Sequence, residues 1–134
     1  MIFIDTSVLV AYIVEKDSNH EKAVSLMEEI IKGKHGSAIT SEYVFDETVT
    51  VVLVRSKSLE SAIMSGELIK ESVPILDVSS SIFEASWGRF QRQQTTRFSF
   101  TDCTILELVE ANHVENLATF DREFTSSHSF KVVG

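Results

Sequence analysis

Short runs of apolar residues alternate along this chain with longer stretches in which apolar positions recur every three or four residues. The short runs are typical of buried strands, and the longer stretches are typical of amphipathic helices. This pattern predicts strands over residues 2–4, 38–39, 75–78, 117–120 and 130–133. Predicted helices begin near residues 6, 19, 41, 58, 80 and 101, and the last five end near residues 32, 55, 73, 93 and 113. Strands that alternate with helices predict an α/β fold with a parallel, helix-covered sheet.

Several residues mark where the predicted helices begin and end. Ser18-Asn19-His20-Glu21 reads as a capping box, and Thr40 or Ser41 can cap the helix that follows. Pro74 ends the helix before it, because proline cannot continue a helix. The helix after residue 80 carries a stripe of aromatic residues at helical spacing: Phe83, Trp87 and Phe90.

The composition fits one compact domain over residues 1–134, because 43% of the residues are hydrophobic and only one proline and five glycines occur. The single cysteine, Cys103, excludes an internal disulfide and favours a reducing compartment such as the cytoplasm. We expect Cys103 to be a small buried residue rather than a nucleophile. The four histidines lack the spacing of a zinc motif. The apolar run over residues 2–14 is too short to cross a membrane, and no basic leader precedes it.

The net charge narrows the classes of function. Twenty acidic residues against twelve basic residues give a formal charge of −8. Such a charge disfavours a general nucleic-acid coat protein. A negative net charge is compatible with an enzyme that binds phosphate groups through bound metal ions, because the metal ions then supply the local positive charge.

Four acidic residues occupy positions that differ from those of ordinary surface acids. Asp5 and Asp121 each follow an apolar strand, and ligands bind beyond the carboxyl ends of parallel strands. Glu47 interrupts the apolar edge of its helix, and Asp102 shares a helix face with Ile105 and neighbouring apolar residues. Each acid also has an ordinary interpretation, as a helix cap, a first-turn acid or a side chain that reaches water. Together, however, the four acids can converge on one site beyond the carboxyl ends of the parallel strands.

Carboxylates at close range repel one another, which raises their pKa values. A divalent cation bound between the carboxylates would offset this electrostatic repulsion. A ligand set of oxygen atoms without histidine or cysteine selects Mg²⁺ or Mn²⁺ rather than zinc.

The segments around these acids form an ordered set: FIDTSVLVAY around Asp5, ITSEYVFDETVTVVL around Glu47, FSFTDC around Asp102 and LATFDREF around Asp121. In this order they resemble the PIN domain ribonucleases, especially the small VapC-like toxins of type II toxin–antitoxin pairs. The resemblance implies a three-layer α/β/α sandwich with a central parallel sheet of four to five strands. It also implies a metal-dependent endoribonuclease that hydrolyses RNA phosphodiester bonds with Mg²⁺ or Mn²⁺.

The resemblance also implies roles for individual residues. The catalytic and metal-binding acids would be Asp5, Glu47, Asp102 and Asp121. Thr6 and Thr119 would support them through hydroxyls that orient an acid or a water molecule, and Ser7 is a further candidate of that kind. Asp46 directly precedes Glu47; we choose Glu47 because of its helix face and its match to the motif.

Basic residues and partners are expected as well. The possible RNA contacts are Arg89, Arg92 and Arg97, with Arg55 and Lys57 as others, although each also suits a solvated surface. The resemblance implies an antitoxin protein as a partner and a homodimer, for which the apolar helix over residues 59–69 offers a surface. One departure from many relatives is Ser129-Phe130, which stands where they have Gly-Phe.

Other interpretations remain open at this stage. A phosphatase of the haloacid dehalogenase type would need a second aspartate where Ser7 stands. A response-regulator receiver would have to use Asp5, Asp77 and Lys131, which leaves Glu47 unused. A PIN-like binding module that no longer cuts RNA is the alternative from a different class.

Overall fold

The computed structural model describes residues 1–125 and 129–134 of the chain, so His128 lies outside the described residues. In this part the chain forms a parallel sheet of five strands in the order β3-β2-β1-β4-β5. The strands are β1 (Ile2–Ile4), β2 (Ala38–Ser41), β3 (Ile75–Leu76), β4 (Asn116–Ala118) and β5 (Lys131–Val133). The predicted parallel α/β fold is confirmed.

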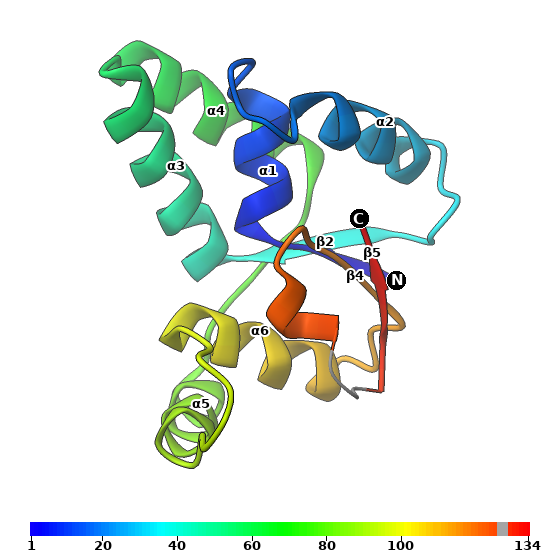
Figure 1. The fold of residues 1–134 in the computed structure, drawn as a ribbon, viewed down its shortest axis with the longest axis vertical. Helices are drawn as coiled ribbons and strands as arrows, with labels where there is room; N and C mark the ends of the chain where they lie inside the picture. The colour runs from blue at the N-terminus through cyan, green and yellow to red at the C-terminus, as the bar shows by residue number, and fades with distance from the viewer. Residues whose placement is uncertain (126–128) are drawn as a thin grey trace.

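Helices cover both faces of the sheet. They are α1 (Thr6–Ile13), α2 (His20–Ile31), α3 (Glu42–Ser56), α4 (Leu59–Ser72), α5 (Ser80–Gln91), α6 (Phe100–Ala111) and a short 3-10 helix, η1 (Arg122–Thr125). Helices α1 to α4 lie on one side of the sheet, and α5, α6 and η1 lie on the other (Figure 1). The described part therefore has the expected three layers, with α5 packed on the outside of α6.

Serine side chains begin four of the helices by accepting a hydrogen bond from a backbone N–H in the first turn. These serines are Ser41, Ser58, Ser79 and Ser99. The predicted capping box at residues 18–21 is wrong, because α2 begins at His20 and its N-cap residue, Asn19, makes no side-chain cap. Asp17 instead accepts a hydrogen bond from the Asn19 backbone N–H at 2.9 Å, which forms a turn ahead of the helix.

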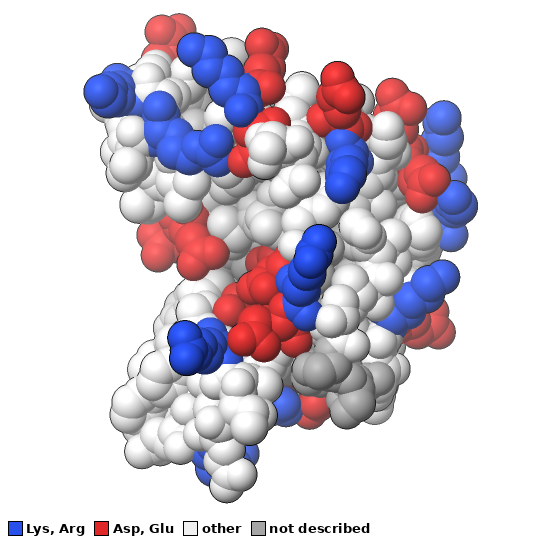
Figure 2. Space-filling model, viewed as in Figure 1, with Lys and Arg blue, Asp and Glu red and all other residues white. Residues whose placement is uncertain are grey.

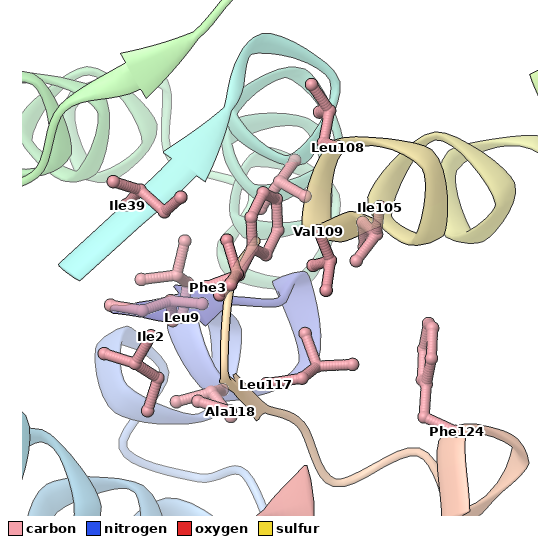
Figure 3. Packing of buried hydrophobic residues seen from close by; sticks show 14 of the residues in the cluster. Ile2, Phe3, Leu9, Ile39, Ile105, Leu108, Val109, Leu117, Ala118 and Phe124 are labelled. Carbon is pink, nitrogen blue, oxygen red and sulfur yellow. The ribbon is translucent and has the colours of Figure 1, made fainter. Parts of the chain in front are cut away.

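The core lies between the sheet and the helices on both of its faces. Ile2, Phe3 and Ile4 of β1 are fully buried because β1 is the central strand. Figure 3 shows that Phe3 and Leu117 belong to the same cluster as apolar side chains of α6. Burial of one such side chain contributes about 1.5–3 kcal/mol, so β1 is firmly anchored up to the residue before Asp5. Cys103 is buried as predicted.

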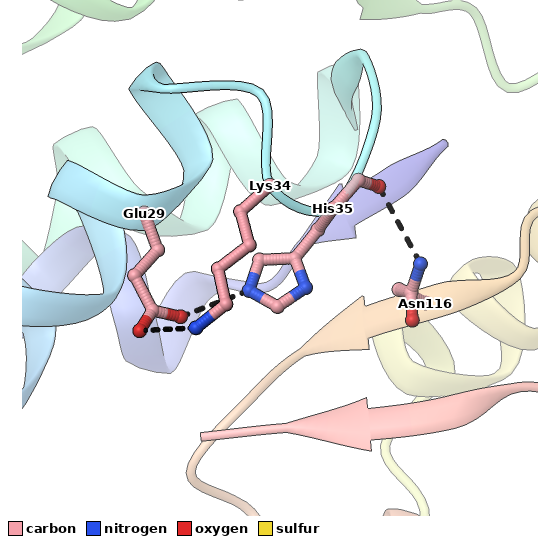
Figure 4. A network of polar contacts seen from close by, with 4 residues as sticks. All are labelled: Glu29, Lys34, His35 and Asn116. Atoms are coloured by element: carbon pink, nitrogen blue, oxygen red, sulfur yellow. Dashed lines mark hydrogen bonds and ion pairs between the residues drawn. The ribbon is translucent and has the colours of Figure 1, made fainter.

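A polar network secures the amino edge of the sheet (Figure 4). Glu29 of α2 accepts hydrogen bonds from Lys34 at 2.8 Å and from the His35 ring at 3.0 Å. The His35 carbonyl accepts a hydrogen bond from Asn116 of β4 at 3.4 Å. These contacts fix the connection into β2 at one edge and leave the carboxyl ends of the strands at the opposite edge.

Two apolar surfaces remain uncovered in the described part. The aromatic stripe of α5 is exposed, because α5 packs against α6 rather than against the sheet. Its rings surround Phe100 at centroid distances of 5.1–6.4 Å. Helix α4 exposes Leu59, Ile63 and Leu68. No helix within residues 1–125 and 129–134 is long and apolar enough to cross a membrane.

Candidate active site

The register of the two central strands sets up the site. Strands β1 and β4 pair Ile4 with Ala118, so Asp5 and Thr119 emerge side by side at the carboxyl edge. The Asp5 backbone N–H donates to the Ala118 carbonyl at 3.0 Å. The Thr119 hydroxyl donates to Asp5 Oδ2 at 2.7 Å. A contact between residues 114 positions apart therefore follows directly from parallel pairing.

Asp5 is held by three donors. Its Oδ1 accepts from the Thr6 backbone N–H at 2.7 Å, which caps α1. Its Oδ2 accepts from the Ser7 hydroxyl at 2.8 Å as well as from Thr119. The Ser7 oxygen also accepts from the Phe120 backbone N–H at 3.0 Å, so Ser7 joins α1 to the chain beyond β4. Asp5 is thus both a helix cap and a buried carboxylate at the edge of the sheet.

Thr119 connects Asp5 to Asp121. Its hydroxyl oxygen accepts a hydrogen bond from the Asp121 backbone N–H at 3.0 Å while its proton is donated to Asp5. Asp121 Oδ1 accepts from the Glu123 backbone N–H at 2.9 Å, and η1 follows. One threonine therefore fixes the position of both acids that follow strands.

The other two acids come from helices. Glu47 is half-buried on α3, whereas the adjacent Asp46 is exposed. Asp102 lies in the first turn of α6 and forms a reciprocal capping box with Ser99, whose backbone N–H donates to Asp102 Oδ2 at 2.9 Å. Asp102 thus stabilises the start of α6 and lines the same pocket as Asp5.

All four acids line one pocket of about 410 Å³. Its other lining residues are Thr6, Ser7, Val10, Asp17, Asn19, Val51, Arg55 and Ser99. Figure 2 shows acidic side chains gathered in a hollow in the middle of this face, with basic side chains on its borders. Asp46 does not line the pocket, which favours Glu47 as the second acid.

The carboxylates share the pocket without converging at its centre. Within the described residues, no three acidic, histidine or cysteine side chains lie close enough to form a metal centre as they stand. Both Asp5 oxygens and one Asp102 oxygen accept hydrogen bonds from neighbouring donors.

The pocket disfavours ionised carboxylates. Burial raises the pKa of Asp5, although hydrogen bonds from Thr119, Ser7 and Thr6 oppose this effect. Burial also raises the pKa of Asp102 to about 6, and the negative charges of Asp5 and Asp121 add to this rise while Ser99 opposes it. A cation bound here would reverse these effects.

The residues present fit a hard divalent cation. The donors are carboxylate oxygens, which Mg²⁺ and Mn²⁺ prefer. The Thr6 hydroxyl oxygen is buried in the pocket wall and has no hydrogen-bond partner among the described residues.

The basic residues named from the sequence as possible RNA contacts differ in their position relative to the pocket. Arg89, Arg92 and Arg97 are not among the residues that line the pocket. Arg89 donates to Glu107 at 2.7 Å and to Glu110 at 2.9 Å, which joins α5 to α6.

The lining arginine is Arg55, paired with Asp17. Sequence reasoning named Arg55 only among further candidates and missed Asp17. The four-residue spacing of Glu47, Val51 and Arg55 along one helix face was the available signal.

The fold and the pocket define a parallel α/β protein with an acidic cleft at the carboxyl edge of its sheet. This chain belongs to the PIN domain family, whose sequence profile matches residues 2–126.

Individual relatives agree with this assignment. The chain is 25% identical over 127 residues to the 23S rRNA-specific endonuclease VapC20 of Mycobacterium tuberculosis, covering 95% of this chain and 94% of VapC20. The crystal structure of VapC20, described as a Sarcin-Ricin loop cleaving toxin, superposes with a TM-score of 0.84 at 24% identity over 94% of each chain. VapBC2 from Rickettsia felis, solved with a DNA fragment from its promoter, gives a TM-score of 0.70 at 18% identity over 99% of this chain and 98% of the other.

Proposed function

We propose that this protein is a divalent-cation-dependent endoribonuclease and the toxin of a type II toxin–antitoxin pair. The observation that carries the proposal is the set of four carboxylates that line one pocket in a chain of the PIN domain family. The similarity to VapC20, which is named as an endonuclease specific for 23S rRNA, supports RNA as the substrate.

The residues that would hold the cation are Asp5, Glu47, Asp102 and Asp121. Bound there, Mg²⁺ or Mn²⁺ would supply the positive charge that activates water and stabilises a phosphate under attack. The oxygen-only donor set and the raised pKa values of Asp5 and Asp102 support this assignment.

The chain's own residues hold this arrangement in place. Thr119 and Ser7 fix the orientation of the Asp5 carboxylate, and Thr119 also positions Asp121 through its backbone N–H. The Thr6 hydroxyl, which is buried beside the pocket and has no hydrogen-bond partner among the described residues, is proposed to support the acids. Hydrolysis in such a site needs no covalent intermediate, and buried Cys103 does not line the pocket.

The wider setting follows from the same proposal. One PIN domain spans residues 1–134 and acts in the cytoplasm, where its single cysteine suits a reducing environment. An antitoxin protein restrains the nuclease. The exposed apolar side chains of α4, including Leu59, Ile63 and Leu68, support a homodimer.

Cleavage of ribosomal RNA tests the proposal. Wild-type protein is expected to cut 23S rRNA in Mn²⁺ or Mg²⁺ and to lose this activity in EDTA. Asp5→Asn keeps the size of the side chain and one of its two acceptor oxygens, and is expected to abolish cleavage in Mn²⁺. RNA binding without cleavage, under every cation condition, would instead identify a non-catalytic binding module.

A further inference from the structure

One positively charged side chain, that of Arg55, lies on the wall of the acidic pocket. Arg55 is the basic residue among the described residues that line it, and it shares a face of α3 with Glu47 and Val51. Arg55 follows Glu47 by eight positions, which corresponds to about 12 Å along the helix axis. Arg55 therefore lies at a distance from the four proposed metal-binding acids rather than between them.

Asp17 holds the Arg55 side chain in place. One guanidinium nitrogen of Arg55 donates to Asp17 Oδ2 at 2.7 Å. The other carboxylate oxygen of Asp17 accepts from the Asn19 backbone N–H at 2.9 Å, so the acid is itself fixed to the turn before α2. The hydrogen bond from Arg55 lowers the pKa of Asp17, which keeps this carboxylate ionised.

The pair leaves most of the guanidinium available. Arginine has five N–H donors, and the bond to Asp17 uses one of them. The Arg55 side chain is 40% exposed, whereas that of Asp17 is 16% exposed. The free donors of a fixed, planar guanidinium match the oxygens of a phosphate group.

Arg89 provides a comparison within the same fold. It uses two nitrogens on two carboxylates of α6, and its side chain is 26% exposed. Within residues 1–125 and 129–134, Arg55 has a single acidic partner; its side chain is more exposed than that of Arg89, and it lines the pocket.

We propose that Arg55 binds a backbone phosphate of the RNA that flanks the scissile bond, and that Asp17 positions Arg55 for this contact. The inference rests on the proposed nuclease function and adds a binding subsite to it. In a pocket lined by five carboxylates, a fixed cation offsets repulsion of the strand and sets the direction in which RNA crosses the acids.

RNA binding as a function of salt concentration tests the contact. A fluorescein-labelled oligouridylate is titrated in Mn²⁺ with proteins that carry Glu47→Gln, which prevents cleavage. Added Arg55→Gln is expected to weaken binding about tenfold at low salt. It should also make the slope of log Kd against log salt shallower by about 0.7, the value for one phosphate contact on a single strand. Lys131→Gln removes the same charge at the amino end of β5, opposite the site, and should leave Kd and slope unchanged.

Asp17→Asn tests whether Asp17 positions Arg55, separately from the contact of Arg55 with RNA. The variant keeps the charge of Arg55 but loses the ion pair, so in the cleavage-competent protein KM is expected to rise while kcat stays within about twofold. Arg55→Lys is expected to keep the salt slope and to recover only part of the affinity, because lysine lacks the planar donor pair.

The outcomes distinguish this inference from the proposed function. If wild-type protein cleaves RNA while Arg55→Gln keeps the Kd and salt slope of its parent, the inference is wrong and the nuclease function stands. A lowered Tm alone would then show that the pair only joins α3 to the turn before α2. If wild-type protein neither cleaves nor binds RNA in Mn²⁺, the proposed function fails and the Arg55 inference fails with it.

Discussion

Replacing Asp102 by asparagine is expected to stabilise the folded protein above about pH 6 while it removes an acid that the proposed activity requires. Asparagine has the shape of aspartate and can still accept the hydrogen bond from the Ser99 backbone N–H, so the cap of α6 is kept. What it removes is a negative charge in a desolvated pocket near Asp5 and Asp121.

The sign and size follow from the pKa of Asp102, which rises from 3.8 to about 6 on folding. Below pH 3.8 both the folded and the unfolded chain carry the proton, and Asp102 adds no penalty. As pH rises from 3.8 to about 6 the unfolded chain ionises first, so the free energy of unfolding falls and then stays low. A difference of about 2 pKa units at about 1.36 kcal/mol per unit gives about 3 kcal/mol. Because Asp102 is only partly buried, solvent screening reduces the expected gain from asparagine to about 1–2 kcal/mol.

Thermal unfolding in EDTA across this pH range is the assay. At pH 7.5 Asp102→Asn should raise the Tm by about 3–8 °C, and at pH 4 the gain should largely vanish. Asp46→Asn changes an exposed acid outside the pocket and should shift the Tm little at either pH. A variant that is less stable than wild type at pH 7.5, or equally stabilised at both pH values, would refute the reasoning.

Two further substitutions test the supporting residues. Thr119→Val removes the donor to Asp5 and leaves the Asp121 backbone N–H without its acceptor, so thermal unfolding should show a loss of about 1–3 kcal/mol. RNA cleavage should also fall by at least about tenfold, whereas Thr119→Ser should retain most of both; full activity in Thr119→Val would show that the hydroxyl does not position the acids. Arg89→Met breaks the ion pairs between α5 and α6 and should cost about 1 kcal/mol of stability, with the salt slope of RNA binding unchanged. A shallower dependence of RNA binding on salt concentration in Arg89→Met would instead indicate that Arg89 contacts RNA.

The sequence predicted the elements well because the physical signals were local. Each strand contains two or three adjacent apolar residues, and the amphipathic spacing of the helices matches α2, α3, α4, α5 and α6 to within about two residues at most ends. The acids that follow strands could be placed for the same reason, since Asp5 and Asp121 come just after β1 and β4 and parallel strands end at one edge.

The remaining features depend on contacts between distant segments. The bond from Thr119 to Asp5 and the bridge from Ser7 to Phe120 follow from strand register, which a single sequence does not specify. The pair of Arg55 and Asp17 requires α3 to pass beside the turn before α2. The exposed stripe of α5 has ordinary core spacing, and only its packing outside α6 leaves it open to solvent.

The proposed function requires that Glu47 and the three aspartates of the pocket hold a divalent cation. Calorimetric titration with Mn²⁺ of wild type, Glu47→Gln and Asp46→Asn tests it most directly, because the two substitutions neutralise adjacent acids of which only Glu47 lines the pocket. Wild type and Asp46→Asn are expected to bind Mn²⁺ alike, and Glu47→Gln is expected to lose at least about tenfold in affinity. Equal binding by Glu47→Gln and wild type, or no Mn²⁺ binding by wild type, would contradict it.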